Sequence, residues 1–344
     1  MNKKNVRQKG IKGITLIALI ITVIVMLILV AVTISMAING GLFEKAQEAG
    51  QETNEAVEAE QQLANGQVTI GDKTYNSIDE YLNKDKVETI PTTESYVGCY
   101  ADFNGDGTPE GIIYADLAHT VSGRWNNDDW SDYAYTAESG FKSYYIKEEN
   151  YTEGVFDNNN EEEPTAMIAP VEGTTGKDRF YVMALKDITT ANYTTFYWYY
   201  NATGKLNRPV ETDYNDFGEG KGNTIAMIND WNKNTATYGE QNTQDMWGVI
   251  QEEGIQEKYP LVTSQNDSQK WFVPSKAEWS AFGDYLYTKL GVTTENYGNY
   301  GLSYCYWSSS QIDAGYAYGA SFGTNYMYYD TVDNFGYVRF SATF

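Results

Sequence analysis

The longest apolar stretch of the chain lies close to its N-terminus. Residues 14–38 carry no charge, and the polar members of this stretch are Thr15, Thr22, Thr33 and Ser35. At 1.5 Å per residue, a helix of this length covers about 37 Å, which exceeds the about 30 Å of a bilayer's hydrocarbon core. The pattern therefore predicts a membrane-spanning helix over residues 14–38, with membrane lipid as its partner.

The flanking charges predict the orientation of this helix. Five basic residues precede it within the first 13 positions, and Glu44, Glu48 and Glu52 follow it. The positive-inside rule then places the N-terminus in the cytoplasm and the C-terminal domain outside the cell. A cleaved signal peptide is the alternative, but its apolar region usually has 7–15 residues and ends at a small-residue motif. The prediction is a single-pass protein of the cell membrane.

Two further segments precede the main domain. Residues 42–64 are rich in Ala, Glu and Gln, which favour helix, so residues 14–65 are expected to form one transmembrane and stalk helix. Residues 66–95 are expected to be a linker. It contains a hairpin over residues 67–75, because two alternating runs flank Gly71-Asp72.

From Tyr96 onward, short apolar runs alternate with Gly, Asn and Asp. Expected strands are 96–101, 111–117, 180–185 and 196–200. Expected helices are 223–231, 243–251 and 276–289, the last beginning with a capping box formed by Ser275 and Glu278. The predicted fold class is α+β: a long N-terminal transmembrane and stalk helix, followed by one domain over residues 96–344.

Composition narrows the classes of function. The formal net charge is −23, and so acidic a surface repels phosphate backbones, which excludes nucleic acid as the expected partner. A single histidine, His119, makes a histidine-based metal site or catalytic triad improbable. The 30 tyrosines and 31 glycines, together with Asn and Ser, are typical of exposed recognition surfaces.

The segment from Lys12 to Ile17 resembles the leader of type IV prepilins. Residues 1–13 would be the leader, and the resemblance implies that a prepilin peptidase cleaves between Gly13 and Ile14. The family usually has a glutamate at the fifth mature position, where it helps to register subunits in a filament. This chain has Ala18 there, so filament assembly stays open.

A series of motifs marks the C-terminal part: Trp271-Phe-Val-Pro-Ser275, Glu278-Trp279, Tyr306-Trp-Ser-Ser-Ser310 and Tyr337-Val-Arg-Phe340. The series resembles the C-type-lectin-like fold in its formylglycine-generating-enzyme-like branch. Within that branch it is most similar to the variable proteins of bacterial diversity-generating retroelements. Such systems randomise adenines in a template copy and write the result into the gene, which implies a variable region over about residues 304–339.

The composition of this region is consistent with the resemblance. Residues 312–337 contain no Lys, Glu, Gln or Trp and only one Met, as expected if asparagine codons are randomised at adenines. A Tyr- and Gly-rich pair of structural strands would have a similar composition. Expected inward anchors are Ala317, Ala320, Phe322, Met327, Val332, Val338 and Phe340. The expected ligand-contacting residues are Ile312, Asp313, Gly315, Tyr316, Tyr318, Ser321, Gly323, Thr324, Tyr326, Tyr328, Tyr329, Asp330, Asp333, Asn334 and Phe335.

Two further chemical signals lie outside this region. Asp102, Asn104 and Asp106 alternate as calcium ligands do, although Ile113 stands where an EF-hand has its bidentate carboxylate. A calcium site is therefore an alternative to a tight Asn-Gly/Asp-Gly turn, and no other cofactor is expected. The catalytic branch of the resembled family uses a close cysteine pair, whereas Cys99 and Cys305 lie far apart in sequence, so no enzyme activity is expected.

Together these observations predict a membrane-anchored receptor or adhesin at the cell surface. Its diversified face would bind a protein or glycan on another cell, a phage or a host. The alternative is a minor type IV pilin or pseudopilin, associated with a pilus, whose head is structural or adhesive.

Overall fold

The computed structural model describes residues 16–39, 68–70, 73–75, 87–149, 151, 156, 165–200, 216–233 and 241–344. The chain forms two compact units, Met1–Lys86 and Val87–Phe344, and each is described by itself. The prepilin-like leader, the cleavage point between Gly13 and Ile14 and the predicted stalk over residues 42–64 lie outside the described residues.

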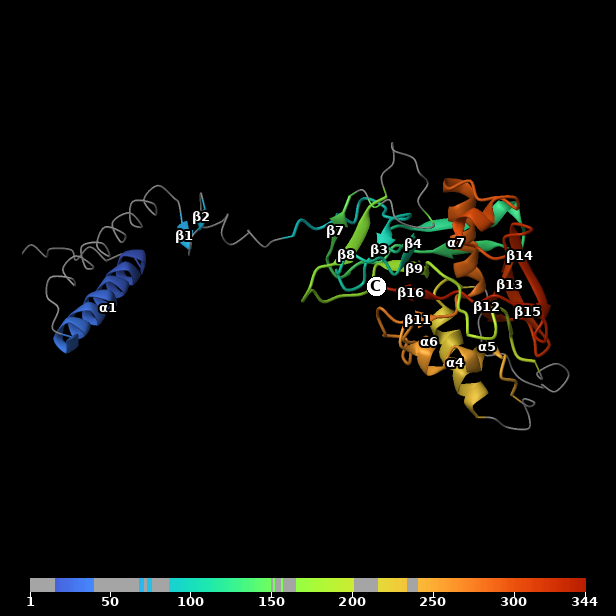
Figure 1. Cartoon of the computed structure of the whole chain (residues 1–344). Coiled ribbons are helices and arrows are strands. Elements are labelled where there is room, and N and C mark those ends of the chain that lie inside the picture. The colour runs from blue at the N-terminus through green and yellow to red at the C-terminus, as the bar shows by residue number, and fades with distance from the viewer. Residues whose placement is uncertain are drawn as a thin grey trace, which may run out of the picture. The chain divides into compact units, whose positions relative to one another are not determined.

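The first unit contains one described helix and one hairpin. Helix α1 covers Leu16–Asn39, and strands β1 (Val68–Ile70) and β2 (Lys73–Tyr75) pair antiparallel. The pairing joins Ile70 to Lys73, as predicted from the two alternating runs around residues 71–72 (Figure 1).

The prediction of a membrane protein is contradicted. Within the described part of the chain, no helix combines the length and the apolar character that crossing a membrane requires. The predicted transmembrane and stalk helix and the predicted single-pass localisation are corrected accordingly.

The second unit is built around a mixed seven-stranded sheet. The strand order is β11-β16-β9-β4-β3-β8-β7, and only β3 and β8 pair in parallel. Figure 1 shows the C-terminus at β16, inside this sheet. The strands are β3 (Tyr100–Ala101), β4 (Gly111–Asp116), β7 (Tyr144–Glu148), β8 (Met167–Pro170), β9 (Phe180–Ala184), β11 (Trp271–Phe272) and β16 (Ser341–Thr343).

Both faces of this sheet are buried at its central strands β4 and β9. Along β4, Ile113 packs into one apolar cluster, whereas its neighbours Ile112 and Tyr114 pack into the other. Strand β9 alternates in the same way, with Val182 on one face and Met183 on the other. A strand that is covered on both sides needs apolar residues at every position, which explains the unbroken apolar runs of β4 and β9.

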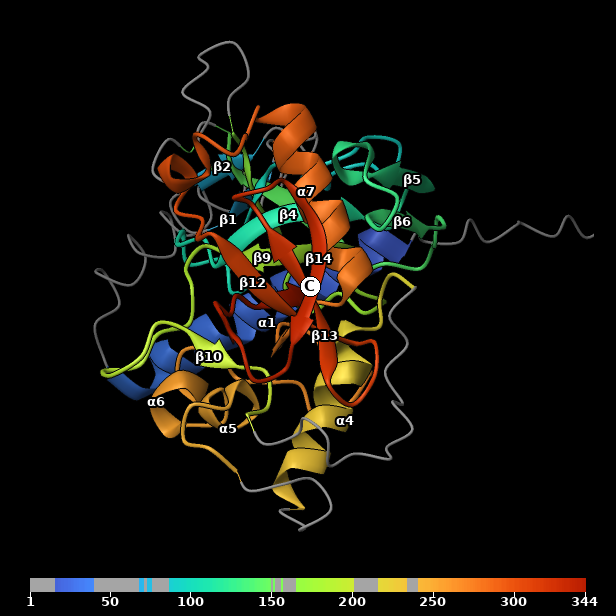
Figure 2. The same ribbon diagram turned by 90° about the vertical axis from the view of Figure 1, so that its right-hand side faces the viewer.

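Three smaller sheets complete the unit. Strands β12 (Cys305–Gln311), β13 (Tyr316–Ser321) and β14 (Tyr326–Thr331) form an antiparallel sheet, which lies in front in Figure 2. The two other sheets are the hairpin of β5 (Val121–Arg124) with β6 (Asp132–Tyr135), and the pair of β10 (Phe196–Tyr197) with β15 (Phe335–Gly336).

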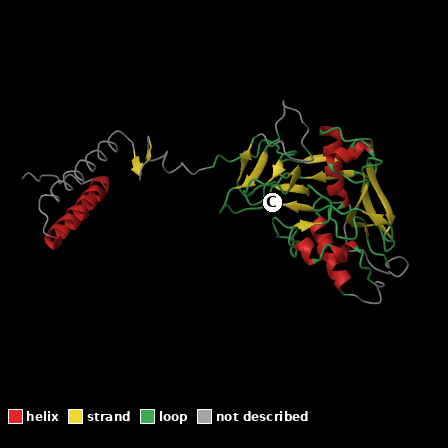
Figure 3. Ribbon diagram, viewed as in Figure 1, coloured by secondary structure: helices red, strands yellow, loops and turns green. Residues whose placement is uncertain are grey.

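The described helices of this unit are short. They are α4 (Gly220–Asn232), α5 (Met246–Val249), α6 (Glu253–Gln256), α7 (Lys276–Lys289) and the 3-10 turns η1 (Trp125–Asn127) and η2 (Tyr297–Tyr300). Strands therefore outnumber helices among the described elements (Figure 3), and the predicted α+β class with a long leading helix is wrong. The physical reason is that Tyr and Val favour β-strands, so the short runs that contain them form strands and not helices.

Helix α7 positions the small sheet. It contacts β4 of the large sheet, the β5–β6 hairpin and all three strands β12–β14. Its predicted bounds and its predicted cap are confirmed: Ser275 Oγ accepts from the Glu278 N–H, and a Glu278 carboxylate oxygen accepts from the Ser275 N–H at 2.7 Å.

Glu278 makes folding sensitive to pH. It is fully buried, and burial raises the pKa of its carboxyl from 4.5 to about 7. The folded state thus favours the protonated acid, so its contribution to stability is complete below about pH 4.5 and is lost as the pH rises through 7. We expect Glu278→Gln to remove roughly 3 kcal/mol of the fall in unfolding free energy between pH 5 and 8. Urea denaturation of both proteins between pH 5 and 8 measures this difference. If the unfolding free energy changed equally with pH in the two proteins, the prediction would be wrong.

Candidate functional site

The predicted variable region coincides with the three-stranded sheet. Strand β13 lies in the middle, and its register joins Tyr318 to Tyr329 and Ala320 to Met327. Since paired residues of antiparallel strands point to the same side, each face of the sheet is defined by alternate residues. One face continues into the core beneath α7, and β14 forms an edge of the sheet.

The predicted frame of this sheet is confirmed. The seven expected anchors are all buried, each with at most 2% of its surface exposed: Ala317, Ala320, Phe322, Met327, Val332, Val338 and Phe340. Phe322 lies 5.0 Å from the ring of Trp125 and 5.9 Å from that of Tyr306. The anchors thus hold the hairpin to the body of the domain.

The expected contact residues divide into three groups. Seven are exposed: Asp313, Tyr316, Tyr326, Tyr329, Asp333, Asn334 and Phe335. Six are half-buried: Ile312, Gly315, Gly323, Thr324, Tyr328 and Asp330. Tyr318 and Ser321 are buried, so the expectation that they point outward is wrong.

Both corrections have a local cause. The ring of Tyr318 is covered by Lys276, whose Nζ lies 4.9 Å from the ring centroid, at the start of α7. The Ser321 hydroxyl accepts from the N–H of Thr324 at 3.2 Å and bonds to the Thr324 hydroxyl at 2.6 Å. Ser321 therefore stabilises the turn between β13 and β14 and is unsuited to contact a ligand.

An exposed group of rings, which we call the aromatic platform, consists of Trp130, Tyr316 and Tyr329. Their exposed fractions are 48%, 41% and 51%. Trp130 stacks on Tyr329 with centroids 5.6 Å apart, and Tyr316 meets Tyr329 edge-on at 5.9 Å. Large, rigid, amphipathic rings of this kind supply contact area at little cost in side-chain entropy.

Trp130 was not among the expected site residues. It lies in the loop between β5 and β6, nearly 200 residues before Tyr329. This loop is tied to the β13–β14 turn: Trp125 Nε1 donates to Asn325 Oδ1, and the Met327 N–H donates to Ser131 Oγ at 3.1 Å. The available signal was an isolated Trp among the polar residues Asn126–Asp132, which marks an apolar side chain without a core position.

The opposite face of the sheet carries a polar group around Tyr328. A Cβ on Gly319 would lie 2.6 Å from the Tyr328 ring and 2.7 Å from the Tyr306 carbonyl oxygen, so only glycine leaves room for this ring. Tyr328 hydrogen-bonds to Cys305, and Asp330 accepts from the Asn334 amide at 2.7 Å. These side chains support one another at the edge of the sheet.

A second group of rings, Tyr197, Tyr200 and Phe335, lies where β10 pairs with β15. Phe335, which is 45% exposed, stacks on Tyr197 with centroids 4.3 Å apart, and Tyr197 lies 4.6 Å from Tyr200. The pairing of β10 with β15 brings these residues together. Tyr197 lies on β10 and Tyr200 follows this strand, and the sequence did not connect either residue with the site.

The candidate calcium ligands lie in a self-bonded loop. Asp102 is buried, and its carboxylate accepts from the N–H groups of Gly105 and Gly107 at 2.7 and 2.8 Å. Asp106 accepts from the N–H of Thr108 and from the Asn104 amide. Within the described residues, no group of three or more His, Cys, Asp and Glu side chains is arranged to hold a metal ion. A calcium site here stays a prediction.

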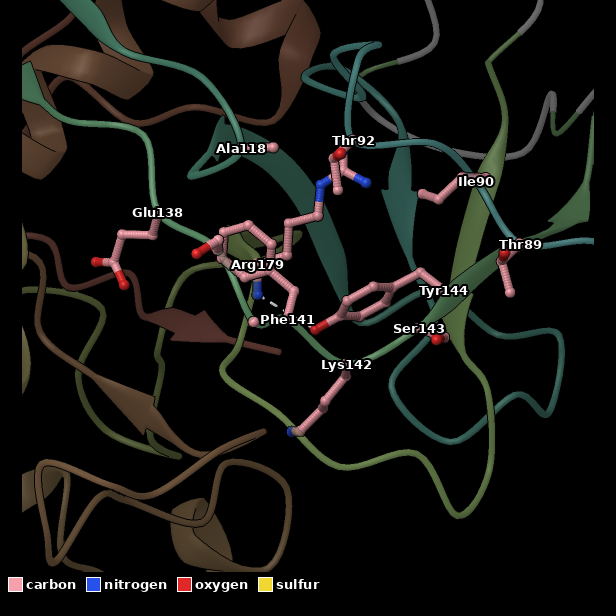
Figure 4. Close-up of a pocket in the computed structure, with 12 residues that line it drawn as sticks. Thr89, Ile90, Thr92, Ala118, Glu138, Phe141, Lys142, Ser143, Tyr144 and Arg179 are labelled. Carbon is pink, nitrogen blue, oxygen red and sulfur yellow. Dashed lines mark hydrogen bonds between the residues drawn. The ribbon is translucent and has the colours of Figure 1, made fainter.

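A cavity of about 420 Å³ lies next to the N-terminal segment of the second unit (Figure 4). Its two cations are already paired. Arg179 binds Asp116 through Nε and Nη2 at 2.8 and 2.9 Å, and Lys142 donates to Asp178 and Ser268 at 2.7 Å each. Arg179 also donates to the carbonyl oxygens of Pro91 and Glu94. This cavity is therefore better explained by anchoring of residues 91–94 than by binding of an anion.

Comparisons with protein families, with curated proteins and with solved structures find no match to this chain.

Proposed function

We propose that this chain is a ligand-binding protein whose β12–β14 sheet and adjoining loops form an exchangeable contact surface, diversified by a retroelement. The ligand would be a protein or a glycan. One observation carries the proposal: the side chains expected to vary lie mostly at the surface, whereas the seven expected anchors are buried. A surface can vary without loss of the fold only if its frame is made by other residues.

The aromatic platform supports this proposal energetically. In interfaces, a few aromatic anchors contribute most of the affinity, and the surrounding polar residues mainly exclude water. Beside Tyr316, the exposed Asp313 carboxylate accepts from the Tyr316 N–H at 3.1 Å. Trp130 lies outside the predicted variable region, so it would be a constant anchor beside exchangeable ones.

The state of the two cysteines favours binding over catalysis. Cys99 and Cys305 are both free. Burial raises the pKa of Cys99 to about 11, and burial also raises that of Cys305. A nucleophilic cysteine needs a lowered pKa, because the thiolate is the reactive form.

The DNA next to the gene provides the direct test. We expect a reverse transcriptase gene and a near-copy of the codons for residues 304–339 that differs from them only at adenines. Sequencing this region in several isolates should place the differences at codons for exposed residues and leave those for the anchors unchanged. The absence of such a copy would refute the retroelement proposal.

The tolerance of the fold to replacement of these exposed side chains can be measured on the protein. We expect the triple variant Tyr316→Ser, Tyr326→Ser, Tyr329→Ser to lose no more than about 2 kcal/mol of unfolding free energy, since exposed substitutions cost little beyond the ring contacts. Urea denaturation and near-ultraviolet circular dichroism would measure this.

The matched control places three serines on the frame of the same hairpin. Ala320→Ser, Met327→Ser and Val332→Ser together should abolish the cooperative transition, because they put hydroxyls without partners and a cavity into the core. If both triple variants lost equal stability, the division into face and frame would be wrong.

A further inference from the structure

Two acidic loops lie at one end of the β12–β14 sheet. The loop from β12 to β13 contains Asp313, the turn after β14 contains Asp333, and both aspartates are exposed. The Val332 N–H donates to the Gly315 carbonyl oxygen at 3.0 Å, and this bond joins the two loops. Tyr316 of the aromatic platform begins β13 directly after the first loop. The platform and the two loops therefore adjoin one another.

This surface carries negative charge without a matching cation. Residues 304–338 contain no Lys, Arg or His. Among the described residues, neither Asp313 nor Asp333 has a basic side chain within ion-pair distance. Two bases lie nearby, and aspartates of the β5–β6 hairpin offset both: Arg124 lies 2.7 and 2.5 Å from two of them, and Lys276 is attracted by two. A ligand that supplies positive charge would therefore complement this surface.

One ring on the same face of the sheet already holds a cation. The Lys276 ammonium lies 4.9 Å from the ring centroid of Tyr318, which follows Tyr316 by two positions on β13 and points to the same side. Trp130 lies 6.3 Å from Tyr318, so this ring adjoins the platform. Ring faces carry negative partial charge and attract ammonium and guanidinium groups. The exposed rings of the platform offer the same contact to a cation from another molecule.

We propose that the aromatic platform and the two acidic loops bind a basic segment of a partner protein. This inference rests on the proposed ligand-binding function and names the class of the ligand. Arginine or lysine side chains of the partner would stack on the platform rings and pair with Asp313 and Asp333. Arginine fits best, because a guanidinium is planar, stacks on rings and presents a fork of N–H donors to a carboxylate. The net charge of −23 would also speed the encounter with a basic partner.

The constant and the exchangeable residues would have different parts in this contact. Trp130 lies outside the predicted variable region, so its ring would serve every diversified copy of the protein. Asp313 and Asp333 lie within the region and would fit this copy to a basic ligand.

Selection of phage-displayed random dodecapeptides on the full chain tests this assignment. Platform binders are those peptides that do not bind the double variant Tyr316→Ser, Tyr329→Ser. Among them, we expect Arg and Lys to be enriched at least about threefold over the unselected library, and binding to weaken about tenfold between about 0.05 and 0.5 M salt. Platform binders without this enrichment, or no platform binders, would overturn the proposal. Platform-dependent binding of neutral oligosaccharides on an array, without any basic peptide, would assign a glycan instead.

A pair of matched variants separates a local contact from the overall charge. Asp313→Asn with Asp333→Asn removes two charges and keeps the side-chain oxygen that accepts from the Tyr316 N–H. Calorimetry with the best selected peptide should show binding about tenfold weaker. Glu253→Gln with Glu257→Gln removes the same charge at α6, which lies apart from β14 in Figures 1 and 2, and should change the affinity less than about twofold.

Equal effects of the two double variants, with circular dichroism showing both folded, would overturn the assignment of the peptide to this surface. The retroelement proposal is judged separately, by the template copy of the codons for residues 304–339. A failure with basic peptides would leave that proposal standing, and the absence of the copy would leave the peptide result standing.

Discussion

Replacing Phe322 by alanine is expected to lower the unfolding free energy by about 3–5 kcal/mol. Phe322 is fully buried at the turn end of β13, where its ring contacts Trp125, Trp279 and Tyr306. These neighbours belong to three different elements, so they cannot all move to fill the space. Urea denaturation at neutral pH measures the loss.

Phe335→Ala is the matched control, because it removes the same ring from the exposed part of the same region. Phe335 is 45% exposed and contacts mainly Tyr197. We expect a loss of about 1 kcal/mol, the usual value of an exposed ring pair. A larger effect of Phe335→Ala than of Phe322→Ala would show that the frame has been assigned to the wrong residues.

Asp187→Ala is expected to be destabilising by about 3–5 kcal/mol, since it leaves a buried guanidinium without its counter-charge. Asp187 accepts from Arg339 Nε at 2.6 Å, from the Tyr306 hydroxyl at 2.9 Å and from the Ser303 hydroxyl at 2.6 Å. Arg339 is fully buried, and its Nη1 has no partner among the described residues. The cluster joins β12 to the segment before β16, so its loss should loosen the β12–β14 sheet first. Hydrogen exchange of the β12 amides would detect this.

A second aspartate–arginine pair provides the control. Asp129 lies 2.7 Å from Arg124, but the two side chains are 87% and 41% exposed. Water and salt screen such a pair, so Asp129→Ala should leave the denaturation midpoint unchanged. If both aspartate variants behaved alike, burial of Arg339 would not be the cause of the effect at Asp187.

Some elements were predictable because their signals are local. Helix α7 begins and ends where its capping box and apolar spacing predicted, at Lys276 and Lys289. The predictions for β4 and β9 were correct to within one residue, because these strands are apolar on both faces. The buried anchors of β13 and β14 were likewise predictable, since small and aliphatic residues alternate there with polar and aromatic ones.

Other predictions failed because the burial of a residue depends on which distant parts of the chain pack against it. Tyr318 was expected outside because it alternates with Ala317, but Lys276 of α7 and Trp130 cover its ring. The apolar run near the N-terminus was expected to cross a membrane, and no helix of the described residues is able to do so. The predicted α+β class gave too much weight to helix-forming segments and too little to the short strands of the second unit.

The sequence alone determined the cap of α7, the strands that are apolar on both faces and the buried anchors of the C-terminal hairpin. These features depend on neighbours within a few residues, where periodicity and turn chemistry act directly. Only the tertiary structure decided that Trp130 joins Tyr316 and Tyr329, and that Phe335 stacks on Tyr197. Such groups come from segments far apart in the chain, and no local pattern encodes which of them meet once α7 and the sheets have packed together.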